Sequence, residues 1–341
     1  MIQYPSKIKK GDLIGVTAPS SGIVGNPYLP RLENAHKNFL ELGYKIIETD
    51  NVRKHSKLVS SDGKTRSEEF MALWKNKNIN WIILASGGEF LIDMLPHIEK
   101  NSIEKFTPKW IQGYSDISLL LHYITTNFNI ATVHNASFHT YGMMPLDKTL
   151  IETIDILQNC NVSEQLSGEK YQIESLHKID GKELSPFNLT ETVEYKNLYN
   201  KEIEKISGRL IGGCVDVLVQ LPGTELDNTV KFCNQFEEGM LWYLENCELT
   251  CPSLYRALLQ MKNSGWFKNA NGFLIGRTYS KESVEDFTYE DVLHQIFDDM
   301  DVPVIYDVDI GHVAPQWTMI NGALGEFEYN NGEGKIIQKM I

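Results

Sequence analysis

Short apolar segments alternate with longer amphipathic ones along the first 160 residues. The apolar segments occupy residues 12–17, 44–48, 81–85, 109–113 and 130–133. The run at 81–85 is continuously apolar, which is typical of strands buried in parallel sheets. Between these segments, apolar residues recur at helical spacing at Leu32, Ala35, Phe39 and Leu42, and again at Leu150, Ile154 and Leu157. A further helix is expected through Asp93 and Leu95. The alternation predicts an α/β domain with a mainly parallel sheet.

The pattern changes at about residue 161. Residues 161–206 are polar with weak periodicity, which predicts a long connector or a mobile flap, because loops of this length are often functional or disordered. Apolar segments return after residue 207, and a chain of 341 residues is expected to form two domains. We therefore expect an N-terminal domain (1–160), the connector or flap (161–206) and a C-terminal domain (207–341).

Charge and composition narrow the class of protein. The net charge of −13 argues against a nucleic-acid partner and against an anionic membrane surface. The N-terminus lacks the apolar region of a signal peptide, and no apolar run reaches the roughly 18 residues needed to span a bilayer. Five sparse cysteines suit a reducing compartment, so we expect a cytoplasmic protein.

No metal or cofactor is expected from the motifs. Cys247 and Cys251 lie close together but lack a second ligand pair at metal-site spacing. The small-residue turn at 18–22 follows a strand, where α/β folds bind ligands, but it lacks the G-x-G-x-x-G fingerprint of dinucleotide-binding proteins.

Ser115 lies at the tip of a turn between the apolar segment 109–113 and a helix. Such a turn exposes a serine beside the free N–H groups of a helix start, as in a nucleophile elbow. The residue two positions later is Ile117, so the G-x-S-x-G pattern is not met. The alternative is that Ser115 and Asp116 cap the helix, and this stretch by itself favours the cap.

Glu245 and His312 also follow predicted strands. In chain order, Ser115, Glu245 and His312 read as nucleophile, acid and base, one of several orders in which a catalytic triad occurs. A serine hydroxyl needs a neutral imidazole to accept its proton, and a carboxylate orients the imidazole. Glu248 competes for the role of the acid, and His134, in the domain of the serine, competes for that of the base.

A glycine pair, Gly87 and Gly88, follows the strand at 81–85. It would place flexible backbone at the carboxyl edge of the sheet, where open α/β folds bind ligands. The alternative is a plain connection that needs a positive φ at one glycine, and the two interpretations are about equally favoured.

Taken together, the motifs resemble the LD-carboxypeptidase family of serine peptidases, which includes the microcin C immunity peptidases. The resemblance spans essentially the whole chain. It rests on short motifs in the order of the family: Gly11-Asp12, Val16-Thr17-Ala18-Pro19-Ser20, Asp62 with Arg66, Gly87-Gly88, Gly113-Tyr114-Ser115-Asp116, Gly208 through Gly213, Leu244-Glu245, Gly276-Arg277 and Gly311-His312.

The resemblance implies a fold and a set of site residues. The fold is a Rossmann-like or flavodoxin-like N-terminal domain with a parallel sheet and a smaller, mixed α/β C-terminal domain of the swivelling type. The chain would form a homodimer. The implied triad is Ser115, Glu245 and His312, the implied oxyanion hole is the backbone N–H of Gly88 and Asp116, and the substrate contacts are Gly87, Tyr114 and Arg277.

The implied activity is hydrolysis of an amide near the free carboxylate of a small peptide. The leading substrate is a murein tetrapeptide that loses its terminal D-Ala, and the runner-up is the amide of a peptidyl or aminoacyl nucleotide, as in microcin C immunity. Residues 86–90 and 134–136 depart from the murein-recycling pattern. The stretch 161–206 has no tryptophan to stack on a nucleotide, which leaves Tyr171, Tyr195 or Tyr199. Two other classes of protein remain open, a non-catalytic binding protein and a nucleotide-binding oxidoreductase, and the missing G-x-G-x-x-G weakens the second.

Overall fold

A six-stranded sheet organises the first half of the chain. In the computed structural model, which describes all 341 residues, its strand order is β14-β5-β4-β3-β1-β2. The first five strands along the chain are mutually parallel and lie in the order 2-1-3-4-5, the flavodoxin-like arrangement. They are β1 (Leu13–Thr17), β2 (Lys45–Glu48), β3 (Ile79–Leu84), β4 (Trp110–Gly113) and β5 (Thr132–His134).

Helices cover both faces of this sheet. They are α1 (Tyr28–Glu41), α2 (Gly63–Lys75), α3 (Lys100–Lys105), α4 (Ser118–Phe128) and α5 (Lys148–Asn159). Helix α4 is buried over almost its whole length, because it lies between the first sheet and the second domain, where it contacts β5 and β10. Its residues are buried on all sides, polar ones such as His122 and Thr125 included, as expected for a helix that packs on two layers.

An eight-stranded mixed sheet organises the second half, in the order β6-β16-β15-β10-β11-β12-β13-β9. Strands β10 to β13 are parallel and the others antiparallel. The strands are β6 (Val162–Leu166), β9 (Lys196–Asn197), β10 (Ile203–Cys214), β11 (Met240–Glu245), β12 (Ala270–Gly276), β13 (Val304–Val308), β15 (Leu324–Asn330) and β16 (Glu333–Lys339). The helices are α6 (Val215–Leu218), α7 (Thr229–Cys233), α8 (Cys251–Asn263) and α9 (Tyr289–Phe297).

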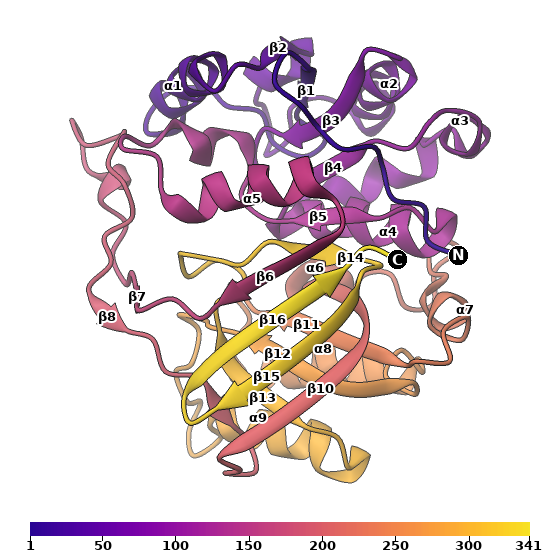
Figure 1. Ribbon diagram of the computed structural model, residues 1–341, viewed down its shortest axis with the longest axis vertical. Helices are drawn as coiled ribbons and strands as arrows, with labels where there is room; N and C mark the ends of the chain where they lie inside the picture. The colour runs from indigo at the N-terminus through magenta and orange to yellow at the C-terminus, as the bar shows by residue number, and fades with distance from the viewer.

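The two domains lie one above the other, with the first domain in indigo to magenta and most of the second in orange to yellow (Figure 1). Strand β14 (Met319–Asn321) belongs to the C-terminal part of the chain but pairs antiparallel with β5 of the first sheet. The chain termini lie close together, and the hydroxyl of Tyr4 donates to the carbonyl of Ile341 over 3.2 Å. The predicted fold class, a parallel-sheet domain followed by a mixed α/β domain, is confirmed.

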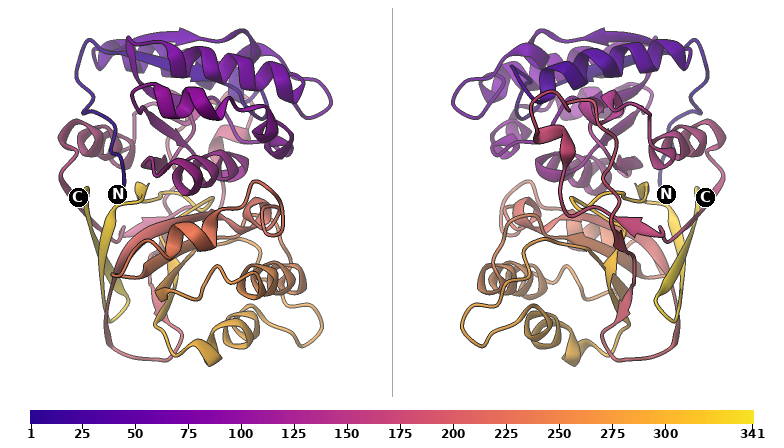
Figure 2. Two further views of the ribbon diagram at one scale, coloured as in Figure 1. Left: turned by 90° about the vertical axis from the view of Figure 1, so that its right-hand side faces the viewer. Right: turned by 90° about the vertical axis from the view of Figure 1, so that its left-hand side faces the viewer.

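Residues 161–206 run along one side of the molecule across both domains (right-hand view of Figure 2). Strands β6 and β9 join the second sheet, and a small hairpin is formed by β7 (Lys170–Tyr171) and β8 (Glu191–Thr192). Toward the first domain, Arg31 Nε donates to the carbonyl of Glu183 over 2.7 Å. The segment is therefore tied to both domains in this structure.

The helix expected through Asp93 and Leu95 is wrong. That stretch forms two 3-10 turns, Leu91–Asp93 and Leu95–His97, and Pro96 lies within the second. The N–H of Leu91 donates instead to the carboxylate of Asp116, and Asp93 pairs with Arg66. No helix of the chain is both long and apolar enough to cross a membrane.

Candidate active site

The carboxyl ends of the parallel strands in both sheets meet at the boundary between the domains. The first edge carries the turn after β4, with Ser115, and the second carries Glu245 at the end of β11 and His312 beyond β13. The rings of Tyr114 and His312 lie 4.9 Å apart between centroids. The residue next to Ser115 therefore contacts the histidine of the other domain.

Ser115 has a left-handed backbone conformation, with φ at +64°. A non-glycine residue rarely adopts this region, and such strain is characteristic of a serine on a sharp turn from strand to helix. Neither Ser115 nor Asp116 caps the helix: no side-chain cap is formed at the 3-10 turn Ser115–Ile117 or at α4. The capping interpretation is therefore wrong, and the half-buried Ser115 hydroxyl has no hydrogen-bond partner within the chain.

Gly87 packs directly against Ser115. A Cβ atom on Gly87 would lie 2.9 Å from Cβ of Ser115 and 3.0 Å from its Oγ, so only glycine fits beside this serine. The backbone N–H groups of Gly88 and Asp116 have no acceptor in the chain. Two free N–H donors on the loops that flank a serine are the elements of an oxyanion hole.

The side chain of Asp116 ties three loops together. Its buried carboxylate accepts hydrogen bonds from the hydroxyl of Ser20 and, over 2.9 Å, from the N–H of Leu91. Burial raises the pKa of Asp116 to about 6, although these hydrogen bonds oppose the shift. This contact holds the loops after β1, β3 and β4 in one arrangement around Ser115.

His312 and Glu245 form a close pair at the edge of the second sheet. The ring Nδ1 of His312 lies 2.8 Å from Oε2 of Glu245. The Glu245 side chain is fully buried, whereas 19% of the His312 side chain is exposed. A buried carboxylate that accepts the Nδ1 proton fixes the tautomer and leaves Nε2 free to act on a substrate.

The pairing of His312 with Glu245 shifts the pKa of both groups. Burial works to lower the pKa of His312, but the charge of Glu245 and the hydrogen bonds at the ring outweigh it and hold that pKa well above its ordinary value. For Glu245, burial works to raise the pKa, and the positive charge and hydrogen bond of His312 bring it below the usual range. Each member of the pair therefore favours the charged form of the other.

The two competing residues are placed differently. Glu248 is exposed, and only its backbone N–H is engaged, with Asp216. His134 is fully buried at the end of β5, and neither ring nitrogen has a hydrogen-bond partner. Burial lowers the pKa of His134 to about 4, partly offset by the charge of Glu245. His134 is thus a neutral histidine behind the site, and no hydrogen bond orients its ring.

Arg277 lies beside the site but is largely engaged by its own chain. The guanidinium pairs with Asp309 over 2.8 Å and stacks on the ring of Tyr171 with its Cζ 4.2 Å from the ring centroid. Its Nη1 is buried without a partner. Asp309 also accepts hydrogen bonds from the N–H of Gly168 and from the hydroxyl of Tyr195, so the loop that carries His312 is anchored to the 161–206 segment.

Cys214 and Asp309 lie at the site, but no sequence motif marks either one as a site residue. Cys214 ends β10 and is paired in register with Glu245, and its thiol lies close to Glu245 and His312. The sequence signal was its position at the end of an apolar strand, after Gly212 and Gly213. Asp309 is the first residue after β13. It holds Arg277 and Tyr195 through contacts between residues that are far apart in the sequence.

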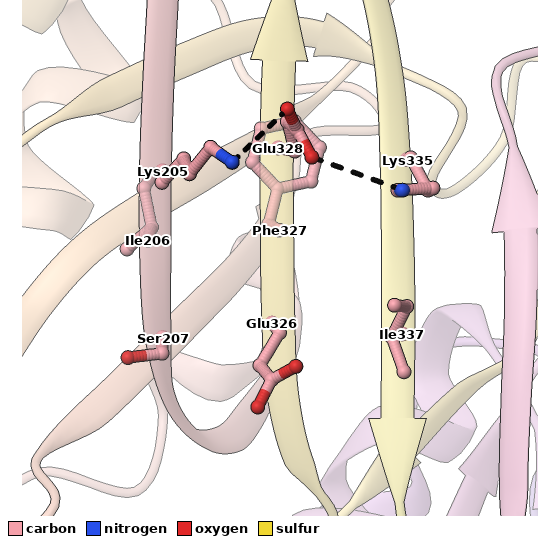
Figure 3. A pocket seen from close by; sticks show the side chains of 8 residues that line it. All are labelled: Lys205, Ile206, Ser207, Glu326, Phe327, Glu328, Lys335 and Ile337. Carbon is pink, nitrogen blue, oxygen red and sulfur yellow. Dashed lines mark ion pairs between the residues drawn. The ribbon is translucent and has the colours of Figure 1, made fainter.

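Two surface pockets lie at different distances from the site. One, of about 430 Å³, lies between β7, β8 and the ends of β12 and β13, and its lining includes Tyr171, Arg277, Tyr279 and Val313. The other, of about 310 Å³, lies on the open face of the second sheet, where Glu328 pairs with Lys205 and Lys335 over 3.3 and 3.7 Å (Figure 3). Lys205 precedes Cys214 by nine residues on β10, roughly 30 Å at about 3.3 Å per residue, so the second pocket is remote from the triad candidates.

Comparison with known proteins shows relatives along the whole chain. The microcin C7 self-immunity protein MccF of Escherichia coli is 25% identical, over 97% of this chain and 94% of that protein. The "Probable murein peptide carboxypeptidase" of Bacillus subtilis is 24% identical, over 94% of this chain and 89% of that protein. A solved structure of MccF in complex with glutamyl sulfamoyl guanosine shares the fold, with a TM-score of 0.84 over 99% of both chains at 22% identity.

Two family models divide the chain between them. The model of the LD-carboxypeptidase N-terminal domain matches residues 14–135, and that of the LD-carboxypeptidase C-terminal domain matches residues 207–327. The N-terminal match contains Ser115, Gly87 and Gly88, and the C-terminal match contains Glu245 and His312. The resemblance found in the sequence is confirmed: the chain belongs to the LD-carboxypeptidase family, peptidase family S66, which also includes MccF-like proteins.

Proposed function

We propose that this protein is a serine carboxypeptidase that hydrolyses an amide bond near the free carboxylate of a small peptide. The observation that carries the proposal is the buried Glu245–His312 pair next to the strained turn of Ser115. A non-catalytic binding protein has no need of a strained serine, an oriented histidine and a buried carboxylate at one place. Membership of the family supports the same conclusion.

The proposed mechanism assigns one step to each group. Nε2 of His312 accepts the hydroxyl proton of Ser115 as Oγ attacks the carbonyl carbon of the substrate. Glu245 holds Nδ1 and stabilises the imidazolium, and the N–H groups of Gly88 and Asp116 donate to the oxyanion of the tetrahedral intermediate. The imidazolium then protonates the leaving amine, and water releases the acyl group from Ser115 by the same steps.

The leading substrate is a murein tetrapeptide that loses its terminal D-Ala. The similarity to a murein peptide carboxypeptidase supports it. Gly87 and Tyr114 border the serine, and the partnerless Nη1 of Arg277 is our candidate for the contact with the substrate carboxylate. We propose that the protein acts in the cytoplasm, which its sparse cysteines support, and as a homodimer, as the family resemblance implies.

The second candidate is hydrolysis of an aminoacyl- or peptidyl-nucleotide amide, and the shared fold with MccF complexes favours it. The structure narrows the side chains that could stack on a base. Tyr195 is buried with its hydroxyl on Asp309, and one face of Tyr171 is covered by Arg277. Tyr199 is half-buried next to His294, which leaves Tyr171 and the exposed Tyr279 at the cavity beside the site.

Incubation with both substrate classes tests the proposal. The wild-type chain and its Ser115→Ala variant would each be mixed with murein tetrapeptide and with processed microcin C, and the products read by mass spectrometry. We expect wild-type protein to release D-Ala and the variant to release none. Cleavage of the nucleotide conjugate alone would favour the second candidate. Binding of either compound without cleavage by wild-type protein would assign the chain to the non-catalytic class.

A further inference from the structure

Three side chains of different chemistry converge at the edge of the second sheet. The thiol of Cys214, the carboxylate of Glu245 and the imidazole of His312 offer ligand atoms that all lie within 4.8 Å of one another. Cys214 and Glu245 are partners in register at the ends of β10 and β11. Thiolate, imidazole and carboxylate are the three kinds of group that bind Zn²⁺ in proteins.

The cluster has unused coordinating capacity. Oε1 of Glu245 is buried without a hydrogen-bond partner. Burying a carboxylate oxygen in this state costs folding free energy. The Cys214 thiol lies 3.4 Å from a carboxylate oxygen of Asp216. Bonds of about 2.0 to 2.3 Å place the ligands of a tetrahedral zinc ion roughly 3.5 Å apart, so a modest contraction of this cluster completes three sides of a site.

We propose that Cys214, Glu245 and His312 form a binding site for a borderline-soft divalent cation such as Zn²⁺, and that the bound cation inhibits the enzyme. The inhibitory part rests on the proposed function, because it requires His312 to be the general base. The binding part stands on the geometry of the three residues. A water molecule supplies the fourth ligand.

Coordination and catalysis exclude each other for a chemical reason. Binding releases the proton of the Cys214 thiol and the proton that His312 Nδ1 shares with Glu245, so that the sulfur and Nδ1 become metal ligands. Glu245 then bonds to the cation instead of the imidazole. The metal-bound ring is a neutral imidazole whose one proton is on Nε2, so Nε2 has no free lone pair and the ring can no longer accept the proton of Ser115.

The cation reaches the site from the side of the substrate. His312 is partly exposed, whereas Cys214 and Glu245 are buried behind it. Substrate and cation would therefore compete for the same approach. Because binding releases protons, it should strengthen as the pH rises.

Cadmium titration of the Ser115→Ala chain tests the site without any need for activity. A Cd²⁺–thiolate bond gives a charge-transfer absorption in the ultraviolet, and competition by Zn²⁺ then reports the affinity for zinc. We expect one equivalent of Cd²⁺ to produce this band. Adding Cys214→Ser should abolish it and weaken Zn²⁺ binding by at least roughly 100-fold, since even residues that only orient a ligand contribute about 10- to 100-fold.

Two further variants complete the experiment. Cys160→Ser, at the end of α5 in the first domain, should leave the band unchanged. His312→Asn should weaken Zn²⁺ binding to a similar extent as Cys214→Ser, and it decides the test if the buried Cys214→Ser variant does not fold. Absence of the band, or a band that persists with unchanged zinc affinity in these ligand variants, would overturn the proposal.

The inhibitory arm uses wild-type protein and murein tetrapeptide. Zn²⁺ should block hydrolysis, and a chelator should restore it. Activity that is insensitive to Zn²⁺ at concentrations that fill the site would overturn the inhibitory part. If no peptide is hydrolysed at all, the proposed function fails while the titration still decides the metal site.

Discussion

Gly311 lies against the carboxylate of Glu245, and no larger residue fits there. A Cβ atom on Gly311 would lie 2.6 Å from Oε2, the oxygen that faces His312. The backbone of Gly311 has φ at +93°, a conformation that L-residues with a side chain rarely adopt. The approach of His312 to Glu245 therefore depends on a glycine immediately before the histidine.

Gly311→Ala should separate the acid from the base. The new methyl group must push the Glu245 carboxylate or the His312 loop aside, and a misplacement of about 1 Å can cost roughly 100-fold in rate. We expect kcat to fall by roughly that factor. Gly223→Ala is the matched control, because Gly223 has a similar φ of +87° but nothing within 4 Å of the new Cβ. Equal losses of activity in both variants would trace the effect to backbone strain alone.

Gly87→Ala should act on the nucleophile in the same way. Its methyl group would lie 3.0 Å or less from the Ser115 side chain, which must turn away from the substrate. We expect a loss of kcat measured with the tetrapeptide, and a lower melting temperature because of the clash. In a Ser115→Gly background the clash partner is absent, so Gly87→Ala should then cost little stability. An equal loss of stability in both backgrounds would show that Gly87→Ala does not act through its contact with Ser115.

Ser115 itself gives a prediction on strain. Ser115→Ala and Ser115→Gly should both remove activity by roughly 10⁴- to 10⁶-fold. The glycine variant should be more stable than the alanine variant by about 1 kcal/mol, because a left-handed conformation costs roughly 1 to 2 kcal/mol for residues with a Cβ. Denaturant unfolding of the two variants measures the difference. Equal stability would mean that the turn relaxes when the hydroxyl is lost.

The main elements of the site could be predicted because each lies at the end of an apolar strand. In a parallel sheet these ends share one edge, which made Ser115 a candidate in the first sheet and Glu245 and His312 candidates in the second. The resemblance to the family, and not the strand pattern, joined the three into one triad. The helix cap could not be excluded from the sequence. Local propensity favours Ser and Asp at a cap, but contacts of Asp116 with distant loops decide the turn.

Long-range pairing accounts for most of what the sequence did not reveal. Strand β14 has three residues, and it pairs with β5 across almost 190 positions of the chain, so no local pattern marks its place in the first sheet. The anchoring of the 161–206 segment depends on buried Asp309 and Tyr195, which are 114 positions apart. Neither residue belongs to a periodic pattern that reports the contact.

The two candidate acids can be separated by matched substitutions. Glu245→Gln keeps the size of the side chain but removes the charge that orients and stabilises the imidazolium, a change that cost roughly 10⁴-fold in an analogous triad. Glu248→Gln should leave kcat nearly unchanged, because Glu248 is exposed and the carboxylate that pairs with His312 is that of Glu245. Steady-state kinetics of both variants gives the ranking, and the reverse ranking would reassign the acid.

The pH profile separates the two candidate bases. A general base must be neutral, and the pKa of His312 is held well above the ordinary value of about 6.5, so kcat/KM should rise with pH through an ionisation above that value. A raised pKa also means that the stability contributed by the charged histidine is complete below about pH 6.5 and is lost as the pH rises through the folded-state pKa.

The substitutions then identify the titrating residue. Glu245→Gln should move the ionisation to lower pH in whatever activity remains, because the carboxylate charge that favours the imidazolium is gone. His312→Asn should remove nearly all activity. His134→Asn should lower stability while the pH profile is kept, since the pKa of His134, about 4, lies far below the expected transition. If His134→Asn were inactive and His312→Asn kept the wild-type profile, the base would lie in the first domain, and the site would not need the contact between the domains.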